Sequence, residues 1–268
     1  MKKILLPTDF SKNSESAIDY AIRLFKSEPC TFYVLHAYHD APSGAVTKMS
    51  AREDLEKLVK SLEVRDDNEH HFEAILERDS VLNLANRIQI DKDADYIFMG
   101  TKGASAIREF FFGSNTLELI RHIENCPIVV VPPDYDFHGL KEIVFATDFK
   151  HTFGTYELSP LVHLAELWDA TLNVAHIKTE KELDELQKLN KDLLRATLKG
   201  TKHHFFEIEG EETVANTLNQ IEKGNKDIGL TALLKTKHGF LERFMREPIV
   251  KNMALKKTVP LLVLHEIK

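Results

Sequence analysis

The same sequence pattern occurs twice in this chain, at a nearly constant offset. Thr8-Asp9-Phe10 follows a short apolar segment near the start, and Thr147-Asp148-Phe149 follows a similar segment in the second half. Three further pairs of segments match: 33–37 with 172–177, 70–72 with 203–205, and 126–131 with 259–264. Matches across several elements predict a tandem duplication of one structural unit rather than two unrelated domains.

Short apolar segments alternate with amphipathic helical patterns in the first copy. The segments that predict strands are 3–8, 31–37, 71–76, 95–99 and 127–131. This alternation requires right-handed crossovers and a parallel sheet covered by helices on both faces. We therefore predict an α/β fold of two tandem doubly wound domains, each a five-stranded parallel sheet in the order 3-2-1-4-5.

A break in the pattern separates the two copies. Pro132-Pro133-Asp134 and Gly139 interrupt the periodicity, so residues 132–139 form the predicted linker. We predict a first nucleotide-binding domain over residues 1–133 and a second domain with a degenerate nucleotide motif over residues 140–268. The last strand of each copy is strongly apolar and needs a partner, because an uncovered apolar edge strand promotes aggregation.

Composition excludes several classes of protein. The chain has 268 residues, of which 43% are hydrophobic and 29% charged, enough for two domains with cores of their own. A net charge of -7 without a Lys/Arg cluster argues against binding nucleic acid. We expect no membrane span and no signal peptide, hence a cytoplasmic location, and buried free thiols at Cys30 and Cys126.

Glycines follow the fourth predicted strand of the first copy. Gly100 and Gly103 allow φ > 0 or close approach of the backbone to a ligand, and Gly113-Ser114-Asn115 begins a helical pattern. The free amides and positive dipole end of that helix suit an anion such as phosphate, while Ser114 could donate to it or cap the helix.

Two of these features converge in the predicted sheet. In the order 3-2-1-4-5, ligands bind where the strand order reverses, beyond the carboxyl ends of strands 1 and 4. Those strands end at Asp9 and Gly100. Asp9 could accept hydrogen bonds from a ribose or an amine, and the glycine turn and helix start could hold phosphates. The residues alone therefore indicate a nucleotide site.

The chain resembles the universal stress protein family in its tandem form. The resemblance rests on Gly100-x2-Gly103-x9-Gly113-Ser114, on Pro7-Thr8-Asp9, and on the ends of strands 2 and 5. It implies binding of ATP, or AMP or ADP, with magnesium, and pairing through the fifth strands as a pseudo-dimer within the chain, with a homodimer as a further option. The implied nucleotide-binding residues are Pro7, Thr8, Asp9, Ala37, Gly100, Gly103, Gly113, Ser114 and Asn115.

The second copy departs from this motif. Glu247-Pro248 replaces the Gly113-Ser114 pair, which puts a negative charge and a residue without an amide proton where phosphate would lie. Leu234-Lys-Thr-Lys237 replaces the first glycine turn, and Gly239 is out of register. Asp148 remains. Our hypothesis is that only the first domain binds ATP.

Each of these features also has a simpler interpretation. The glycines could form ordinary turns, and Asp9 could cap the first helix. His36 and His176 are expected to pack near the sheet and donate locally, and Lys235, Lys237 and His238 to form a solvated turn. The pairs His70-His71 and His203-His204 suggest a metal site, but adjacent strand residues point to opposite faces, so we predict surface or edge positions. Phe110, Phe111 and Phe112 are expected to pack between the loop and the last helix.

No catalytic motif for ATP hydrolysis or acyl transfer is recognisable in the sequence. A bound ATP without a positioned general base should turn over slowly. We therefore predict an adenine-nucleotide-binding stress-response or signalling protein whose protein partners are unknown. Two alternatives remain open: a weak ATPase, and a scaffold that acts through protein contacts without a nucleotide.

Overall fold

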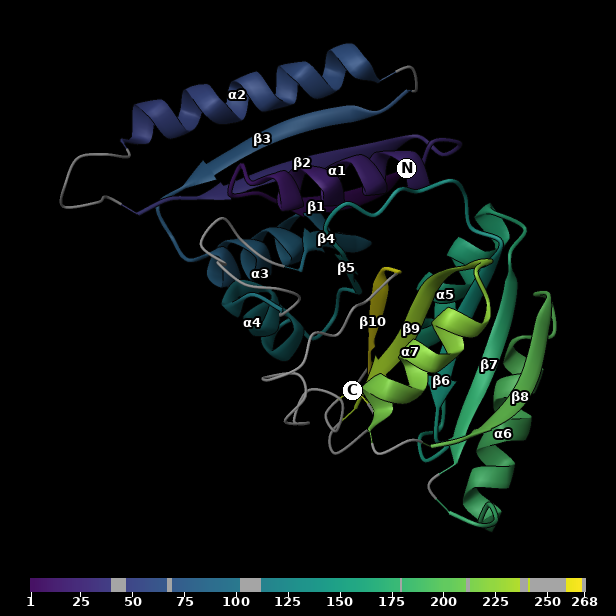
Figure 1. Ribbon diagram of the computed structural model, residues 1–268. Helices are drawn as coiled ribbons and strands as arrows, with labels where there is room; N and C mark the ends of the chain where they lie inside the picture. Colours follow the sequence, from purple (N-terminus) through teal and green to yellow (C-terminus); the bar gives the residue numbers. More distant parts are fainter. Residues whose placement is uncertain are drawn as a thin grey trace. The chain divides into compact units, whose positions relative to one another are not determined.

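The computed structural model describes residues 1–39, 47–66, 69–101, 112–178, 180–210, 213–236, 241 and 259–266. Contacts divide the chain into two compact units, with the division between Asp136 and Phe137. We refer to residues up to Asp136 as unit 1 and to those from Phe137 as unit 2, and each is described by itself (Figure 1).

Unit 1 alternates strands and helices throughout its described residues. Its elements are β1 (Lys2–Pro7), α1 (Lys12–Leu24), β2 (Cys30–Ala37), α2 (Lys48–Arg65), β3 (His71–Glu77), α3 (Val81–Lys92), β4 (Tyr96–Gly100), α4 (Ser114–His122) and β5 (Ile128–Val131). The strands are parallel and follow the order β3-β2-β1-β4-β5. The predicted order 3-2-1-4-5 is therefore confirmed for this unit.

Unit 2 repeats this arrangement. Its elements are β6 (Glu142–Thr147), α5 (Thr155–Leu167), β7 (Thr171–Lys178), α6 (Glu185–Thr197), β8 (His203–Glu209), α7 (Val214–Gly224), β9 (Ile228–Lys235) and β10 (Leu261–His265). Its parallel strands follow the order β8-β7-β6-β9-β10, the same order by position in the repeat. How the two units pair stays a prediction.

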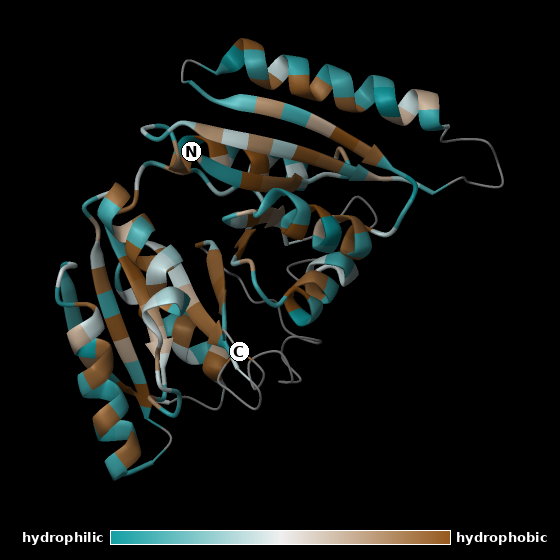
Figure 2. Ribbon diagram, turned by 180° about the vertical axis from the view of Figure 1, so that it is seen from behind, coloured by the Kyte–Doolittle hydropathy of each residue, from teal (hydrophilic) through white to brown (hydrophobic). Residues whose placement is uncertain are grey.

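The core of each unit lies between the sheet and its helices. Central strands are buried on both faces and carry nearly continuous apolar residues, as parallel sheets require (Figure 2). α1 packs on β4, and α3 packs against β1, β2 and the neighbouring α4. None of the helices in the described ranges has the length and apolar character of a membrane-spanning helix.

Candidate functional site

A sharp turn follows β1 and places Asp9 at the carboxyl edge of the sheet. Phe10 has φ 60°, in the left-handed region that side chains disfavour. Two hydrogen bonds hold the turn: the Phe10 amide donates to Thr8 Oγ1 at 3.0 Å, and the Ser11 amide donates to Asp9 Oδ1 at 3.1 Å. Ser11 caps α1 by accepting from the Ser14 amide at 3.2 Å. The helix cap is therefore Ser11, and Asp9 shapes the turn before it.

His36, at the end of β2, fastens this turn to the sheet. Its Nδ1 lies 2.8 Å from the Thr8 carbonyl oxygen, and its ring centre lies 4.4 Å from that of Phe10. A carbonyl oxygen only accepts, so Nδ1 carries the proton in this contact. The prediction that His36 packs near the sheet and donates locally is confirmed. Ala37, the next residue, ends β2 half-buried beside the turn.

Gly100 is required by packing rather than by an unusual backbone angle. A Cβ at this position would lie 2.4 Å from Asn13 Nδ2 and 2.8 Å from the Asn13 carbonyl oxygen, so any side chain would collide with the first turn of α1. Its φ lies outside the left-handed region, which excludes the first of the two alternatives, φ > 0 or close approach to a ligand, for this glycine. Gly103 lies outside the described residues.

Two contacts tie the start of α4 to the end of β4. The Gly113 amide donates to the Thr101 carbonyl at 2.6 Å, and the buried Thr116 hydroxyl donates to the Gly100 carbonyl at 3.0 Å. Gly113 is the N-cap residue and provides no side-chain cap. Ser114 is the first helical residue, so it does not cap the helix. Its side chain and that of Asn115 are exposed at the positive end of the helix dipole.

Strand pairing brings these segments to one edge of the sheet. β1 and β4 are neighbours, with Leu5 opposite Ile97, so the Asp9 turn and Gly100 follow adjacent strand ends. This is where the strand order of unit 1 reverses, the usual place for a ligand in such sheets. The structure thus brings together Thr8, Asp9, Ala37, Gly100, Gly113, Ser114 and Asn115. Pro7 is the last residue of β1, where it is buried opposite Leu35 and directly precedes the turn.

Two further residues lie at this edge, and the sequence pattern alone does not predict their roles there. Asn13 lies against Gly100, a contact that its position near the start of the first predicted helix does not reveal. Thr101 is buried, and its hydroxyl has no hydrogen-bond partner in the part of the chain that the structure describes. Its position inside the glycine motif was the available signal, because a buried hydroxyl usually requires a partner.

Unit 2 reproduces the turn after its first strand. The Phe149 amide donates to Thr147 Oγ1 at 2.9 Å, and the Lys150 amide donates to Asp148 Oδ1 at 3.1 Å. Phe149 has φ 56°, and its ring centre lies 4.9 Å from that of His176. The duplicated motif therefore specifies the same backbone turn in both units.

His176 differs from its counterpart His36. Neither of its ring nitrogens has a hydrogen-bond partner among the described residues, so the prediction of local donation is wrong for this histidine. Burial lowers the pKa of His176, and the nearby Glu207 carboxylate opposes that shift. The ring is therefore neutral at pH 7 and packs on Phe149 as a flat apolar surface.

Helix α6 covers the turn of unit 2 with two polar side chains. Gln187 Nε2 donates to the Asp148 carbonyl at 2.8 Å, and Asn190 Nδ2 donates to the Phe149 carbonyl at 2.8 Å. Both side chains are buried. Asn190 also accepts from the Thr152 hydroxyl at 2.8 Å, and Gln187 donates to Glu180. At this edge of unit 2, the backbone carbonyls of the turn are therefore already hydrogen-bonded to side chains of the protein itself.

Strand register shows what replaces the first glycine in unit 2. Gly100 lies opposite Val131 at the end of β5, and Leu234 lies opposite Leu264 in the corresponding strand pair. Leu234 is buried, as a side chain at this depth must be. Glu247, Pro248, Lys237, His238 and Gly239, on which the rest of the predicted departure depends, lie outside the described residues.

The two histidine pairs lie at the start of the outer strands of the two units, β3 and β8. Within the described ranges no group of three or more His, Cys, Asp or Glu side chains could hold a metal ion. The expectation of a surface or edge position holds for His71, His203 and His204, which lie on these outer strands. A surface position is wrong for His70, whose side chain is fully buried. Its Nδ1 accepts from the Cys30 amide at 3.3 Å, and its ring contacts Phe32 edge-on. Burial lowers the pKa of His70, and Asp66 opposes that shift.

The structure describes both cysteines and one of the three consecutive phenylalanines. Cys30 and Cys126 are free and buried, which confirms the prediction. Burial raises the pKa of Cys30 to about 12, so the thiol is unreactive at neutral pH. Phe112 is buried, whereas Phe110 and Phe111 lie outside the described residues.

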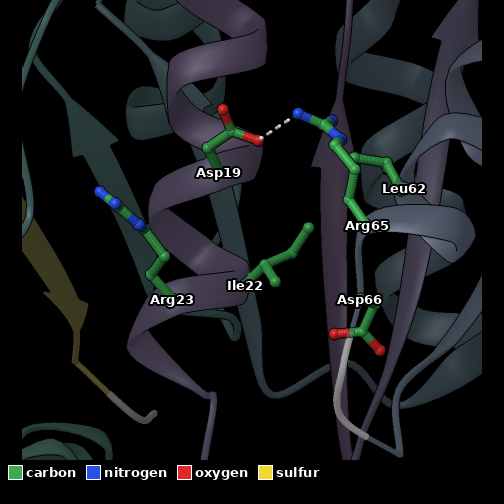
Figure 3. A pocket seen from close by; sticks show the side chains of 6 residues that line it. All are labelled: Asp19, Ile22, Arg23, Leu62, Arg65 and Asp66. Atoms are coloured by element: carbon green, nitrogen blue, oxygen red, sulfur yellow. Dashed lines mark ion pairs between the residues drawn. The ribbon is translucent and has the colours of Figure 1, made fainter.

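A separate pocket of about 350 Å³ lies between α1 and α2 (Figure 3). Asp19 and Arg65 face each other across it at 3.7 Å, above Ile22. Arg23 also lines the pocket and pairs with Asp136 at 3.4 Å. Each guanidinium group thus has an acidic partner within the chain. Because α2 ends here just before β3 begins, the pocket lies toward the amino ends of the strands, away from Asp9.

The sheet order and the turn after the first strand define each unit as a doubly wound α/β protein. Residues 1–132 match the model of the Universal stress protein family. The first half of this chain therefore belongs to the universal stress protein family. A comparison with curated protein sequences finds no significant match.

Solved structures of similar fold extend over both units. A universal stress protein from Archaeoglobus fulgidus DSM 4304 is 16% identical, with 98% of this chain and 96% of that chain covered and a TM-score of 0.71. A putative universal stress protein from Pseudomonas aeruginosa UCBPP-PA14 is 14% identical over 99% of this chain and 93% of that one, with a TM-score of 0.58.

The same fold also occurs in another setting. The cytoplasmic domain of a prokaryotic cation chloride cotransporter is 8% identical over 99% of this chain and 95% of that one, with a TM-score of 0.58. Likeness at these identities shows a shared fold. A function for this chain must therefore be argued from its own site.

Proposed function

We propose that unit 1 binds an adenine nucleotide, ATP or else AMP or ADP, with magnesium, and that the chain is a cytoplasmic stress-response or signalling protein. The observation that carries this proposal is the start of α4, which Gly113 and Thr116 hold against the end of β4 beside the Asp9 turn. An uncapped helix start at the switch point of a doubly wound sheet suits a phosphate group.

Each part of the site has a role in this proposal. The amides of Ser114 and Asn115, with the Ser114 hydroxyl, would hold phosphate oxygens, and Asp9 would accept from the ribose. Gly100, which has no side chain, would let the first turn of α1 lie close to the end of β4 at the base of the nucleotide site. Magnesium would be held mainly by the phosphate oxygens of the nucleotide. At such sites Mg²⁺ keeps several waters and needs only one or two carboxylates from the protein. The family resemblance supports the same assignment.

We propose further that unit 2 does not bind this nucleotide. Gln187 and Asn190 already occupy the carbonyl groups of its turn, and Leu234 replaces the first glycine. A nucleotide would have to displace two buried hydrogen-bonded side chains, each of which would then lose its partner.

Calorimetric titration of ATP with magnesium tests both parts of the proposal. We expect one site per chain in the wild type and no binding in Gly113→Glu, because a carboxylate at the N-cap position would repel phosphate. His122→Glu, at the exposed far end of the same helix, changes the charge equally and should bind as the wild type does. Phosphate release in the same samples would identify the weak-ATPase alternative.

Two results would overturn the proposal. Two nucleotides per chain would refute the assignment of unit 2. A wild type that binds no adenine nucleotide would refute the assignment of unit 1 and leave the scaffold alternative.

A further inference from the structure

The outer surface of α6 carries an exposed leucine stripe, which we define as Leu186, Leu189 and Leu193. Their side chains are 56%, 55% and 41% exposed. They follow the spacing i, i+3, i+7, so they lie along one face of the helix. Figure 1 shows α6 beside β8 at the edge of unit 2, and Figure 2 shows hydrophobic segments along the same helix.

The inner face of this helix explains why the leucines point outward. Gln187 and Asn190 are turned toward the sheet because the carbonyls of Asp148 and Phe149 accept their amide protons. Only Leu194 adds a buried apolar side chain to that face within the helix. Three leucines exposed side by side on one helix face form an apolar patch, which is a candidate interaction surface.

Charge is distributed unevenly along the stripe. The segment 180–185 at its amino end contains four carboxylates and one lysine, a net charge of -3. The segment 195–202 at its carboxyl end contains Arg195, Lys199 and Lys202 and no acidic residue, a net charge of +3. Some of these charges already pair within the chain: Glu180 with Lys150, Glu185 with Lys188, Arg195 with Asp192 and Lys202 with Asp169. With these partners included, the amino end keeps a net charge of -1 (-3 plus two lysines) and the carboxyl end +1 (+3 minus two aspartates). The two ends therefore remain opposite in sign.

We propose that the leucine stripe of α6 docks the same stripe of a second copy of this chain, with the two helices antiparallel. An antiparallel pair places the acidic end of each helix against the basic end of the other, and it aligns opposite ends of the helix dipoles. The arrangement is a self-complementary twofold contact, in which both copies use one patch. The leucines then bury against each other in the centre.

The expected association is weak. A helix of 13 residues is about 20 Å long, so one helix pair buries less than the roughly 1,200 Å² of a standard stable interface. We therefore expect the full chain to dimerise reversibly as its concentration rises from about 10 µM to about 1 mM.

Sedimentation velocity of the full chain over this range tests the proposal. We expect the wild type to shift from monomer toward dimer, and Leu189→Glu to remain monomeric. Val64→Glu is the matched control, because Val64 is a 78% exposed aliphatic residue on α2 of unit 1. It should dimerise as the wild type does. Thermal unfolding of each variant at low concentration should match the wild type.

A charge exchange tests the antiparallel orientation. Glu182→Lys and Lys199→Glu should each weaken the dimer severalfold, and the double variant should restore it, because opposite ends meet in the proposed contact. Restoration would not occur with an unrelated partner or a parallel pair.

Three outcomes would overturn the proposal. The first is a wild type that stays monomeric up to the highest concentration. The second is a dimer that Leu189→Glu leaves intact, because another surface must then form it. The third is a monomer that Leu189→Glu destabilises on heating, because another part of the chain must then cover the stripe.

Discussion

Helices α2 and α6 follow the second strand of their units, and they use their faces in opposite ways. The residues that α2 buries are Ala51, Leu55, Val59 and Leu62. α6 buries Gln187 and Asn190 together with Leu194, and it exposes three leucines. Both helices lie in copies of one fold, so the difference reflects what each helix meets rather than the topology.

The turn beneath α6 accounts for this difference. The Thr-Asp-Phe turn has the same hydrogen bonds and the same left-handed phenylalanine in both units. In unit 2, two carbonyls of that turn are bonded by α6. A motif that unit 1 presents at the edge of its sheet has become part of the hydrogen-bonded interior of unit 2. The two copies therefore share the backbone turn but differ in which side chains contact it.

The largest effect is expected from copying unit 2 into unit 1 at the first glycine. Gly100→Leu should lower the free energy of unfolding by about 3 kcal/mol or prevent folding, because even a Cβ collides with Asn13. Urea denaturation measures this loss. Gly200→Leu is the matched control, because a Cβ there meets no atom within 4 Å. A stable Gly100→Leu protein would show that α1 can move away from β4.

Removing the polar lining of α6 should cost somewhat less. Asn190→Leu leaves the buried Phe149 carbonyl and the Thr152 hydroxyl without this partner, which should lower the free energy of unfolding by about 2 kcal/mol. Lys188→Leu, on the exposed side of the same helix, should change it by less than about 0.5 kcal/mol. Chemical denaturation of both variants distinguishes a hydrogen-bonded interior from a merely polar one, for which the two losses would be equal.

Acid should weaken unit 2 through its buried histidines. Burial lowers the pKa of His265 to about 3, so the folded state does not take up the proton that the unfolded state binds below its ordinary pKa of about 6.5. Stability is therefore complete above that value and falls as the pH decreases. At pH 5 the loss from this residue is about 2 kcal/mol relative to pH 7.

The variant His265→Leu should make the dependence of unfolding on pH between 7 and 5 visibly shallower. His204→Leu, at an exposed position on β8, should leave the slope unchanged. Equal slopes for the wild type and His265→Leu would mean that the histidine is protonated in the folded chain.

The smallest effect is expected at the pocket between α1 and α2. Arg65→Ala removes the ion pair with Asp19, in which the two side chains are 58% and 53% exposed, so the free energy of unfolding should change by less than about 0.5 kcal/mol. Thermal unfolding at low and high salt measures this change. A larger loss would mean that α2 depends on its surface charges more than on its buried apolar face.

The sequence predicted the site of unit 1 better than the packing of unit 2. Asp9 and Gly100 were expected at one edge because their strands are neighbours in a 3-2-1-4-5 sheet, and the register bears this out. The burial of His70 and the contact of Asn13 with Gly100 were not specified, because each depends on distances between segments far apart in the chain.

By itself, the sequence determined the tandem α/β architecture, the strand order and the paired Thr-Asp-Phe turns. These follow from periodicity, right-handed crossovers and repeated local motifs, which act over short stretches of chain. Only the tertiary structure decided which face of α6 is buried. Periodicity shows that the three leucines share a face, but the inward face is chosen by the neighbour. Here two backbone carbonyls require donors, and an unpaired buried carbonyl costs more than an exposed leucine.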